Sequence, residues 1–429
     1  MNEKRILLIS SRQLREIPDR ELGIKNMLED KGFKVTFVLP GRSINNNGYT
    51  DEIANHEIVN KKEGVYVPNQ RKLNRLIRKN DAIFFGSWKQ YDSIVARAQS
   101  QGKPTLSFNS TGGMDHWAIG EHICCVKSPI TKRYLMFVND LFDRGFDSSR
   151  IHVTGSVIYD NVNNNINLES IKSDLFDKYD LDKKKPLAVL FPKAILGMRK
   201  KVRIWFKTWS NTQCDLYCNK LEELYQGICS TIYNSGYNIA VKMHPTAYTS
   251  YMTDYDFENF FWSKFKSIRL LDVVDSVSLF KILDVGIGVN SHAALDTGYF
   301  GKPFIYVDSE KFQIPKRERH EFDLRPFCDI PKGPSSHWEN NPLENVNPWF
   351  PSWLGYYSKL PGLKDLLIEL KNDQCQINED HKNLFIKEFW HNSDGESGKR
   401  IVDKALELIE DYDFKRRKIF SPFRHFISK

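Results

Sequence analysis

Two short polar stretches carry the residue types best suited to bind an anionic ligand. Lys242 and His244 stand in the sequence KMHP directly after an apolar run, and Asn290, Ser291 and His292 follow another apolar run further along the chain. Cationic and hydrogen-bonding groups of this kind can hold phosphates and stabilise the charge of a departing diphosphate. A structural His-Pro turn and an ordinary helix cap at Asn290 or Ser291 are the alternatives.

Four carboxylates complete the set of residues that can do chemistry. Asp296 follows Ser291 by about one helical turn. Its carboxylate can accept hydrogen bonds from ribose or sugar hydroxyls, or it can simply complement a helix dipole. Glu16, Asp19 and Asp115 lie in polar segments of the N-terminal half and are candidates for a general base toward an acceptor hydroxyl. For these three, surface charge at a helix start or in a turn is the alternative.

The stretch from Val273 to Asp308 predicts how the second polar turn is positioned. An amphipathic helix over 275–282 precedes an apolar strand over 284–289, a helix begins near Ala293, and a strand covers 303–307. Helix, strand, tight turn, helix and strand form the βαβ unit of a parallel sheet. Such sheets bind ligands at the carboxyl ends of their strands, where helix N-termini favour phosphate.

The same alternation of strands and helices continues along most of the chain. It predicts an α/β protein with two doubly wound, Rossmann-like domains facing a cleft, which is the default ligand site. We expect an N-terminal domain over 1–165, a C-terminal domain over 166–395, and a crossover helix with a tail over 396–429. The polar stretch 161–167 is the best candidate for the linker between the domains.

Two local patterns lead to more specific expectations. The β-branched pair within His56–Val59 predicts a short strand. The Pro- and Trp-rich segment 313–359 shows few periodic elements and predicts a long loop, which is uncommon unless functional.

Composition restricts the class of protein. The chain has 429 residues with 41% hydrophobic and 27% charged residues, as in ordinary soluble proteins of about two domains. It has no apolar run of membrane-spanning length and no signal-peptide pattern at its start, so we expect a cytoplasmic protein. Seven cysteines without repeated spacing fit a reducing compartment. The pairs Cys124-Cys125 and Cys214/Cys218 predict buried thiols in preference to a zinc site, and we expect no metal.

The net charge of +8 is concentrated at the C-terminus, where residues 414–429 mix Lys and Arg with aromatic and aliphatic side chains. This mixture suits a segment lying on the anionic inner face of the cell membrane, with a solvated tail as the alternative. Nucleic acid is disfavoured because no recognised binding motif accompanies the charge.

The motifs of the C-terminal half resemble a known group of enzymes. The sequences KMHPT, DVGIGVNSHAALDTGYFGKPFIYV and DGESGKRIVDKAL are similar to those of bacterial surface-polysaccharide glycosyltransferases of the GT-B fold. That group includes capsule and teichoic-acid enzymes such as the CDP-glycerol glycerophosphotransferases and the Kdo transferases. The sequence VTGSVIYD also resembles the hinge-proximal strand of non-hydrolysing UDP-N-acetylglucosamine 2-epimerases, which share the fold.

The resemblance implies a metal-independent transferase without a cofactor, which takes a nucleotide-sugar donor in its C-terminal domain and a glycan or lipid-linked glycan acceptor in its N-terminal domain. Donor contacts would come from Lys242, His244, Asn290, Ser291, His292 and Asp296, and His244 would also assist catalysis. Epimerase activity is the weaker alternative, because His292-Ala293 follow Ser291 where the epimerases carry Gly-Gly. A non-catalytic nucleotide- or glycan-binding assembly factor is the third alternative.

Overall fold

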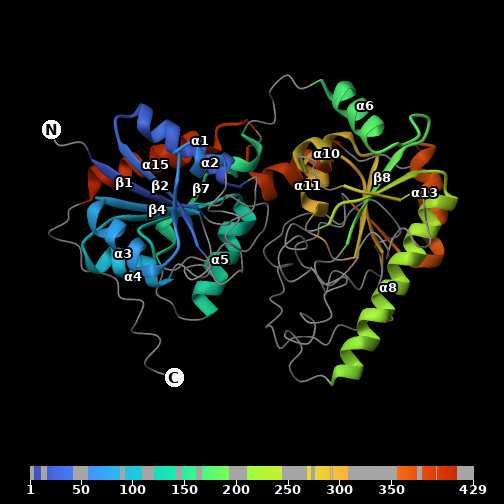
Figure 1. The fold of residues 1–429 in the computed structure, drawn as a ribbon, viewed down its shortest axis with the longest axis horizontal. Helices are drawn as coiled ribbons and strands as arrows, with labels where there is room; N and C mark the ends of the chain where they lie inside the picture. Colours follow the sequence, from blue (N-terminus) through green and yellow to red (C-terminus); the bar gives the residue numbers. More distant parts are fainter. Residues whose placement is uncertain are drawn as a thin grey trace. The chain divides into compact units, whose positions relative to one another are not determined.

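The chain forms two units, each built around a parallel β-sheet (Figure 1). In this computed structural model, unit 1 comprises Met1–Asn164 and Ile386–Lys429, and unit 2 comprises Asn165–Phe385. The structure describes residues 4–10, 17–41, 57–86, 92–108, 120–141, 147–160, 167–192, 210–243, 268–271, 276–289, 291, 293–307, 355–373, 379–392 and 394–412.

Unit 1 contains a seven-stranded sheet in the order β3-β2-β1-β4-β5-β6-β7. Its strands are β1 (Arg5–Ile9), β2 (Lys34–Pro40), β3 (Val65–Val67), β4 (Ala82–Gly86), β5 (Thr105–Phe108), β6 (Ile123–Val126) and β7 (Ile151–Val153). Its helices are α1 (Ile17–Asp30), α2 (Glu57–Asn60), α3 (Gln70–Lys79), α4 (Asp92–Ser100), α5 (Pro129–Leu141) and α15 (Ser397–Asp411), with short helical turns at η2 (Ser148–Arg150), η3 (Val157–Tyr159) and the π-helix η8 (Ile386–Trp390).

Unit 2 contains a six-stranded sheet in the order β10-β9-β8-β11-β12-β13. Its strands are β8 (Leu187–Phe191), β9 (Asn238–Val241), β10 (Ile268–Leu270), β11 (Val285–Gly288), β12 (Phe304–Val307) and β13 (Gly355–Ser358). Its helices are α6 (Leu168–Lys178), α8 (Asn211–Asn234), α10 (Ser276–Ile282), α11 (Ala293–Tyr299), α13 (Leu363–Lys371) and α14 (Glu379–Phe385), with a short turn at η7 (Leu360–Gly362).

Both sheets are buried on both faces, which explains the continuous apolar runs of their central strands. In β1, Ile6 and Leu8 pack with α1 and α15 on one face, whereas Leu7 and Ile9 pack with α3 and α4 on the other. Strand β8 alternates in the same way between a face covered by α8 and α13 and a face covered by α6, α10 and α11. The predicted doubly wound α/β architecture is therefore confirmed in each unit.

One local expectation is wrong. The segment containing Val59 forms the short helix α2, and the strand forms later, as β3, which pairs with β2 through Val38 and Val65. Strand propensity is a weak preference, and the helix lets Val59 pack against the cluster beneath α1. Of the segment 313–359, where the sequence predicts few periodic elements, the structure describes residues 355–359, and these include β13, which pairs with β12.

The chain returns to unit 1 at Ile386, whereas the sequence placed this transition at residue 396. The π-helix η8 accounts for the difference, because its side chains pack on unit 1. Arg133 forms an ion pair with Glu388, and the Lys127 ammonium lies 4.0 Å from the centre of the Trp390 ring. Within the described helices, none has an apolar stretch long enough to cross a membrane.

Candidate functional site

In unit 2, the candidate site lies at the carboxyl edge of the sheet, where the strand order reverses. Strand β8 is first in sequence and lies between β9 and β11. The helices α8 and α11, which follow β8 and β11 in the chain, pack on opposite faces of the sheet. The order 3-2-1-4-5-6 is that of a Rossmann domain, which binds its ligand at this reversal. The candidate residues Lys242 and Ser291, which follow β9 and β11, therefore flank the position where the topology predicts a ligand.

One row of residues crosses this edge in register. Phe191 pairs with Gly288, and Gly288 pairs with Tyr306 on the next strand. On the β9 side of β8, the Lys242 amide donates to the Leu190 carbonyl at 3.0 Å. This bond extends the pairing of β9 with β8 by one residue, so Lys242 lies beside Phe191. Lys242 and Gly288 are therefore two strands apart, a backbone separation of about 10 Å.

Two glycines in β11 let the following helix approach the sheet. A Cβ at Gly286 would lie 2.7 Å from the Phe304 ring and 3.3 Å from the Thr297 hydroxyl of α11. A Cβ at Gly288 would lie 3.1 Å from the Phe191 carbonyl and 3.2 Å from the Ser291 Cβ. Sequence reasoning did not identify either glycine, although their spacing of two on one face of a strand is the signal.

Ser291 forms the turn between β11 and α11. Its hydroxyl accepts a hydrogen bond from the Ala293 amide at 3.3 Å, and its carbonyl accepts one from the Ala294 amide at 3.3 Å. The alternative that Ser291 caps a helix is thus confirmed. Capping leaves the hydroxyl proton available, so the same side chain can still donate to a ligand.

Tyr306 on β12 stabilises this turn with a hydrogen bond. Its hydroxyl donates to the Ser291 carbonyl at 3.1 Å, and its ring is buried. Burial raises the pKa of Tyr306 well above its ordinary value, so the hydroxyl keeps its proton and remains a donor. The sequence analysis did not find this residue, because a tyrosine in an apolar strand has no distinguishing pattern.

Lys242 and Asp296 are the other candidate residues that the structure describes. Lys242 is half-buried immediately after β9, and Asp296 is half-buried in the first turn of α11. The position of Lys242 after β9 suits its predicted contact with a phosphate. The position of Asp296 on α11 suits its predicted role as an acceptor of hydrogen bonds from hydroxyl groups. These roles remain predictions.

The remaining candidates lie outside what the structure describes. His244, Asn290 and His292 fall in this group in unit 2, as do Glu16 and Asp115 in unit 1. Asp19 lies in the first turn of α1, but its side chain is not among those described. The structure therefore brings Lys242, Ser291 and Asp296 to one edge and does not test the proposed general bases.

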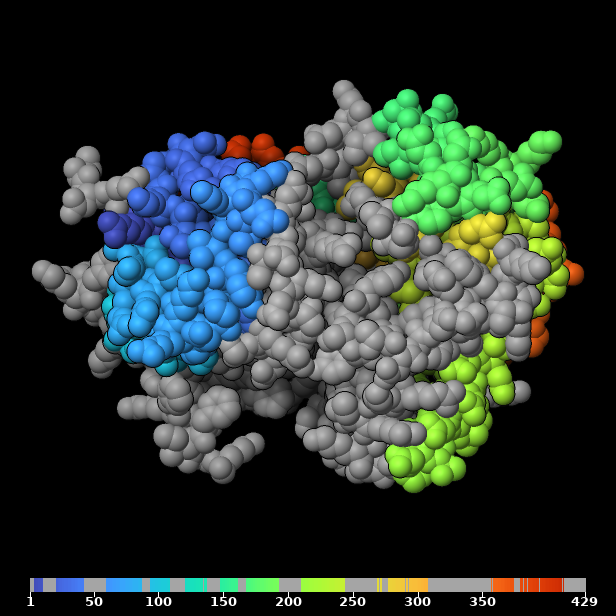
Figure 2. Space-filling model, in the orientation of Figure 1, coloured from blue at the N-terminus to red at the C-terminus, as the bar shows by residue number. Residues whose placement is uncertain are grey.

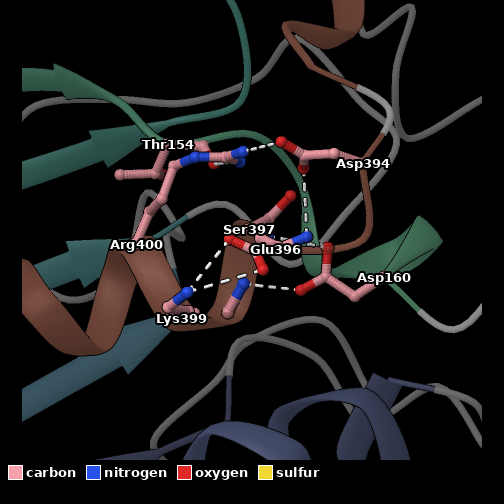
Figure 3. A network of polar contacts seen from close by, with 8 residues as sticks. Thr154, Asp160, Asp394, Glu396, Ser397, Lys399 and Arg400 are labelled. Carbon is pink, nitrogen blue, oxygen red and sulfur yellow. Dashed lines mark hydrogen bonds and ion pairs between the residues drawn. The ribbon is translucent and has the colours of Figure 1, made fainter.

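In unit 1, two sequence motifs that suggested a family resemblance meet each other (Figure 3). The Asp160 carboxylate of VTGSVIYD accepts hydrogen bonds from the Ser397 amide at 3.0 Å and the Gly398 amide at 2.5 Å, at the start of α15. Gly155, with φ +94°, lies so close to the Ser397 hydroxyl that a Cβ would collide with it.

Arg400 extends this network toward the sheet. Its guanidinium donates to the Thr154 carbonyl at 3.1 Å and pairs with Asp394 (Figure 3). Thr154 directly follows β7, so α15 is fixed to the carboxyl edge of the unit 1 sheet. The two motifs therefore perform a structural role within unit 1.

A buried cation lies nearby in the same unit. Lys127 directly follows β6 and is fully buried against Trp390, whose ring meets Tyr159 edge-on at 4.8 Å. Burying an ammonium is costly unless it is compensated, and the Trp390 ring face supplies part of that compensation. This contact holds η8 against unit 1.

The five cysteines in the part of the chain that the structure describes are buried thiols, as the sequence predicted for Cys124, Cys125, Cys214 and Cys218. Burial raises the pKa of Cys124 and Cys125 and, in Cys229, raises the thiol pKa to about 12. Such thiols are neutral and poor metal ligands. Across the described residues, no cluster of three His, Cys, Asp or Glu side chains could hold a metal ion.

Known structures share this architecture at low sequence identity. S. aureus MnaA in a co-structure with UDP has a TM-score of 0.56 and 13% identity, covering 97% of this chain and 100% of that one. The UDP-GlcNAc 2-epimerase from Neisseria meningitidis bound to UDP-GlcNAc has a TM-score of 0.51 and 10% identity, covering 94% and 100%. The wall teichoic acid polymerase TagF has a TM-score of 0.52 and 13% identity, covering 95% and 89%.

The fold is the GT-B type. The C-terminal motifs predicted it, and the similarity to TagF and to the epimerases extends over nearly the whole chain. No protein-family model matches the chain, and no curated protein matches it by sequence. At 10 to 13% identity, the similarity shows the fold alone.

Proposed function

We propose that the protein is a nucleotide-sugar-dependent transferase, which moves a glycosyl or glycerophosphate-like group from an activated donor to a surface glycan. The observation that carries this proposal is the row across the carboxyl edge of unit 2. Lys242, the tight approach at Gly288 and the Ser291 turn flank the strand reversal, where Rossmann domains bind nucleotides.

Each described residue has a specific task in this proposal. The Lys242 ammonium neutralises the donor diphosphate and stabilises the charge that grows on it as the bond to the transferred group breaks. The Ser291 hydroxyl donates to a phosphate oxygen while Tyr306 keeps the turn in place. The absence of a side chain at Gly288 lets the ligand approach the backbone. Asp296 accepts hydrogen bonds from sugar or ribose hydroxyls.

The sequence supplies the remaining roles. His244, Asn290 and His292 extend the donor contacts, and Glu16, Asp19 or Asp115 removes the proton from the acceptor hydroxyl. With Lys242 as the fixed positive charge, the transfer proceeds without a metal. The basic aromatic tail over 414–429 holds the enzyme at the membrane, close to a lipid-linked acceptor.

Nucleotide binding is tested first, by thermal unfolding with CMP, CDP, UDP, GDP and ADP, each with and without EDTA. At a ligand concentration of about 100 Kd, binding adds about 2.7 kcal/mol to the stability of the native state. For a unit of this size that corresponds to a rise in Tm of about 5 to 10 °C. We expect a base-selective, EDTA-insensitive rise for the native chain.

Variants locate the binding at the proposed edge. Lys242→Gln and Ser291→Ala should each reduce the Tm rise, whereas Lys220→Gln, an exposed change on α8, should leave it intact. If no nucleotide raises the Tm, or if Lys242→Gln responds like Lys220→Gln, the donor site is not at this edge.

Epimerase activity is the second candidate, supported by the shared fold of the 2-epimerases. It predicts conversion of UDP-GlcNAc without any acceptor, which proton NMR of the sugar would detect. A transferase instead requires acceptor for turnover. If a nucleotide binds but neither reaction occurs, and binding survives in Glu16→Gln, Asp19→Asn and Asp115→Asn, the protein is a binding factor and the transferase proposal fails.

A further inference from the structure

Helix α3 of unit 1 carries a continuous positive surface. It contains five cations, Arg71, Lys72, Arg75, Arg78 and Lys79, and no acidic residue. All five side chains are exposed, whereas Leu73 and Ile77 are buried against the sheet. At 100° per residue, the five cations fall within an arc of about 120° and extend over about 12 Å. We call this surface the α3 basic face.

The side chains of these cations make few contacts within the fold. Within the part of the chain that the structure describes, none of the five has an ion-pair partner, and only Lys72 makes a side-chain hydrogen bond, to the Tyr66 carbonyl at 3.0 Å. The nearest following acid, Asp81, accepts a hydrogen bond from the Arg5 amide at 2.8 Å. The helix is capped independently by Asn69, whose side chain accepts from the Lys72 amide.

The composition of the face indicates the chemistry of its partner. A protein partner would need apolar or aromatic anchor residues, and the exposed arc of α3 has none. A partner that is bound by positive charge alone is one whose surface is covered with phosphate groups. Because the cations are spread over one convex helix face without an exposed apolar side chain among them, the arrangement fits an array of headgroups better than a pocket-bound ligand. In Figure 2 the light blue surface on the left includes this part of the chain.

We propose that the α3 basic face docks unit 1 on an anionic lipid surface by electrostatic attraction, without insertion into the bilayer. The proposal rests on residues 71–79 alone and does not depend on the transferase proposal. Each cation close to such a surface strengthens binding by roughly fivefold, so three of them contribute about a hundredfold. The attraction weakens as salt screens the charges.

The test is sedimentation of the full chain with phosphatidylcholine vesicles, with or without about 30% phosphatidylglycerol, at low and high salt. The variant Arg71→Gln/Arg75→Gln/Arg78→Gln removes three charges from the face. Its matched control, Lys183→Gln/Lys184→Gln/Lys185→Gln, removes three exposed charges from unit 2. We expect salt-sensitive binding to the anionic vesicles only, and a loss at least tenfold greater in the α3 variant than in the control.

A second measurement does not depend on any variant. Hydrogen exchange of the native chain should slow in peptides covering α3 when anionic vesicles are added, and not with phosphatidylcholine alone. Three results would overturn the proposal: a difference between the two variants of less than tenfold, equal binding to both kinds of vesicle, or unchanged exchange in α3. Binding of soluble polyphosphate through α3 without binding to vesicles would also overturn it, and would assign the face to a linear polyanion.

Discussion

Removing the Asp160 carboxylate should loosen the C-terminal helix of unit 1. The N-cap residue of α15, Glu396, makes no side-chain capping hydrogen bond, so the amides of Ser397 and Gly398 depend on Asp160. These two bonds connect residues more than two hundred positions apart in the sequence. Asp160→Ala would leave both amides without their acceptor and would remove a negative charge from the positive end of the helix dipole.

The expected cost follows from these two contributions. Losing a capping acceptor costs about 1 kcal/mol, and losing a favourable charge at a partly buried helix N-terminus costs about 1 kcal/mol more. A total of about 2 kcal/mol corresponds to a roughly 30-fold increase in the population of molecules with α15 detached. Hydrogen-exchange mass spectrometry of peptides from α15 measures this population directly, because protection of the helix amides falls by the same factor.

Two control variants make the test specific. Asp160→Asn keeps an acceptor oxygen and loses the charge, so its effect should be about half as large. Asp403→Ala removes an exposed carboxylate from the same helix and should leave exchange in α15 nearly unchanged. If Asp160→Ala exchanges like the native chain, or if Asp403→Ala exchanges as fast as Asp160→Ala, then Asp160 does not fasten the helix.

Three further predictions concern packing, positioning and pH. Gly286→Ala should destabilise the protein by about 1 to 3 kcal/mol in urea unfolding, because the new Cβ overlaps the buried Phe304 ring. Gly23→Ala, whose Cβ meets nothing within 4 Å, should instead stabilise the protein by about 0.5 to 1 kcal/mol. Equal effects of the two changes would contradict the packing described at β11. Tyr306→Phe should lower the free energy of unfolding by about 1 kcal/mol and weaken nucleotide binding, since the Ser291 carbonyl loses a donor. Unchanged binding would show that the turn does not need this hydrogen bond. The pKa of His391 is lowered by burial and by Arg400, so the folded chain resists protonation of this side chain. The stability of the native chain should therefore fall as pH drops below about 6.5, and it should fall less in His391→Gln. Identical profiles of stability against pH would show that His391 does not cause the fall.

The pattern of strands and helices could be derived from the sequence because its causes are local. Fully apolar runs such as Leu187–Phe191 can only be buried on both faces, and helices of period 3.6 between them predict parallel sheets. The helix start at Ser291 was also predictable, since a serine before a helix is a common cap. These local rules failed at α2, where strand propensity was outweighed by the packing of Val59.

The arrangement of the candidate site depends on the tertiary structure. Sequence spacing cannot give the row in which Lys242, Phe191 and Gly288 lie side by side, because strand order and register are set by long-range packing. Nor could it show that Gly286 is needed to let α11 approach β11.

The role of the Asp160 motif shows the same division. The sequence showed that VTGSVIYD and DGESGKRIVDKAL resemble motifs of known enzymes, since their residue types are visible in the chain itself. Only the tertiary structure decided that the Asp160 carboxylate caps the helix begun by Ser397, because that contact joins distant segments. Local chemistry therefore determined which elements form, and packing between distant elements decided which residues meet.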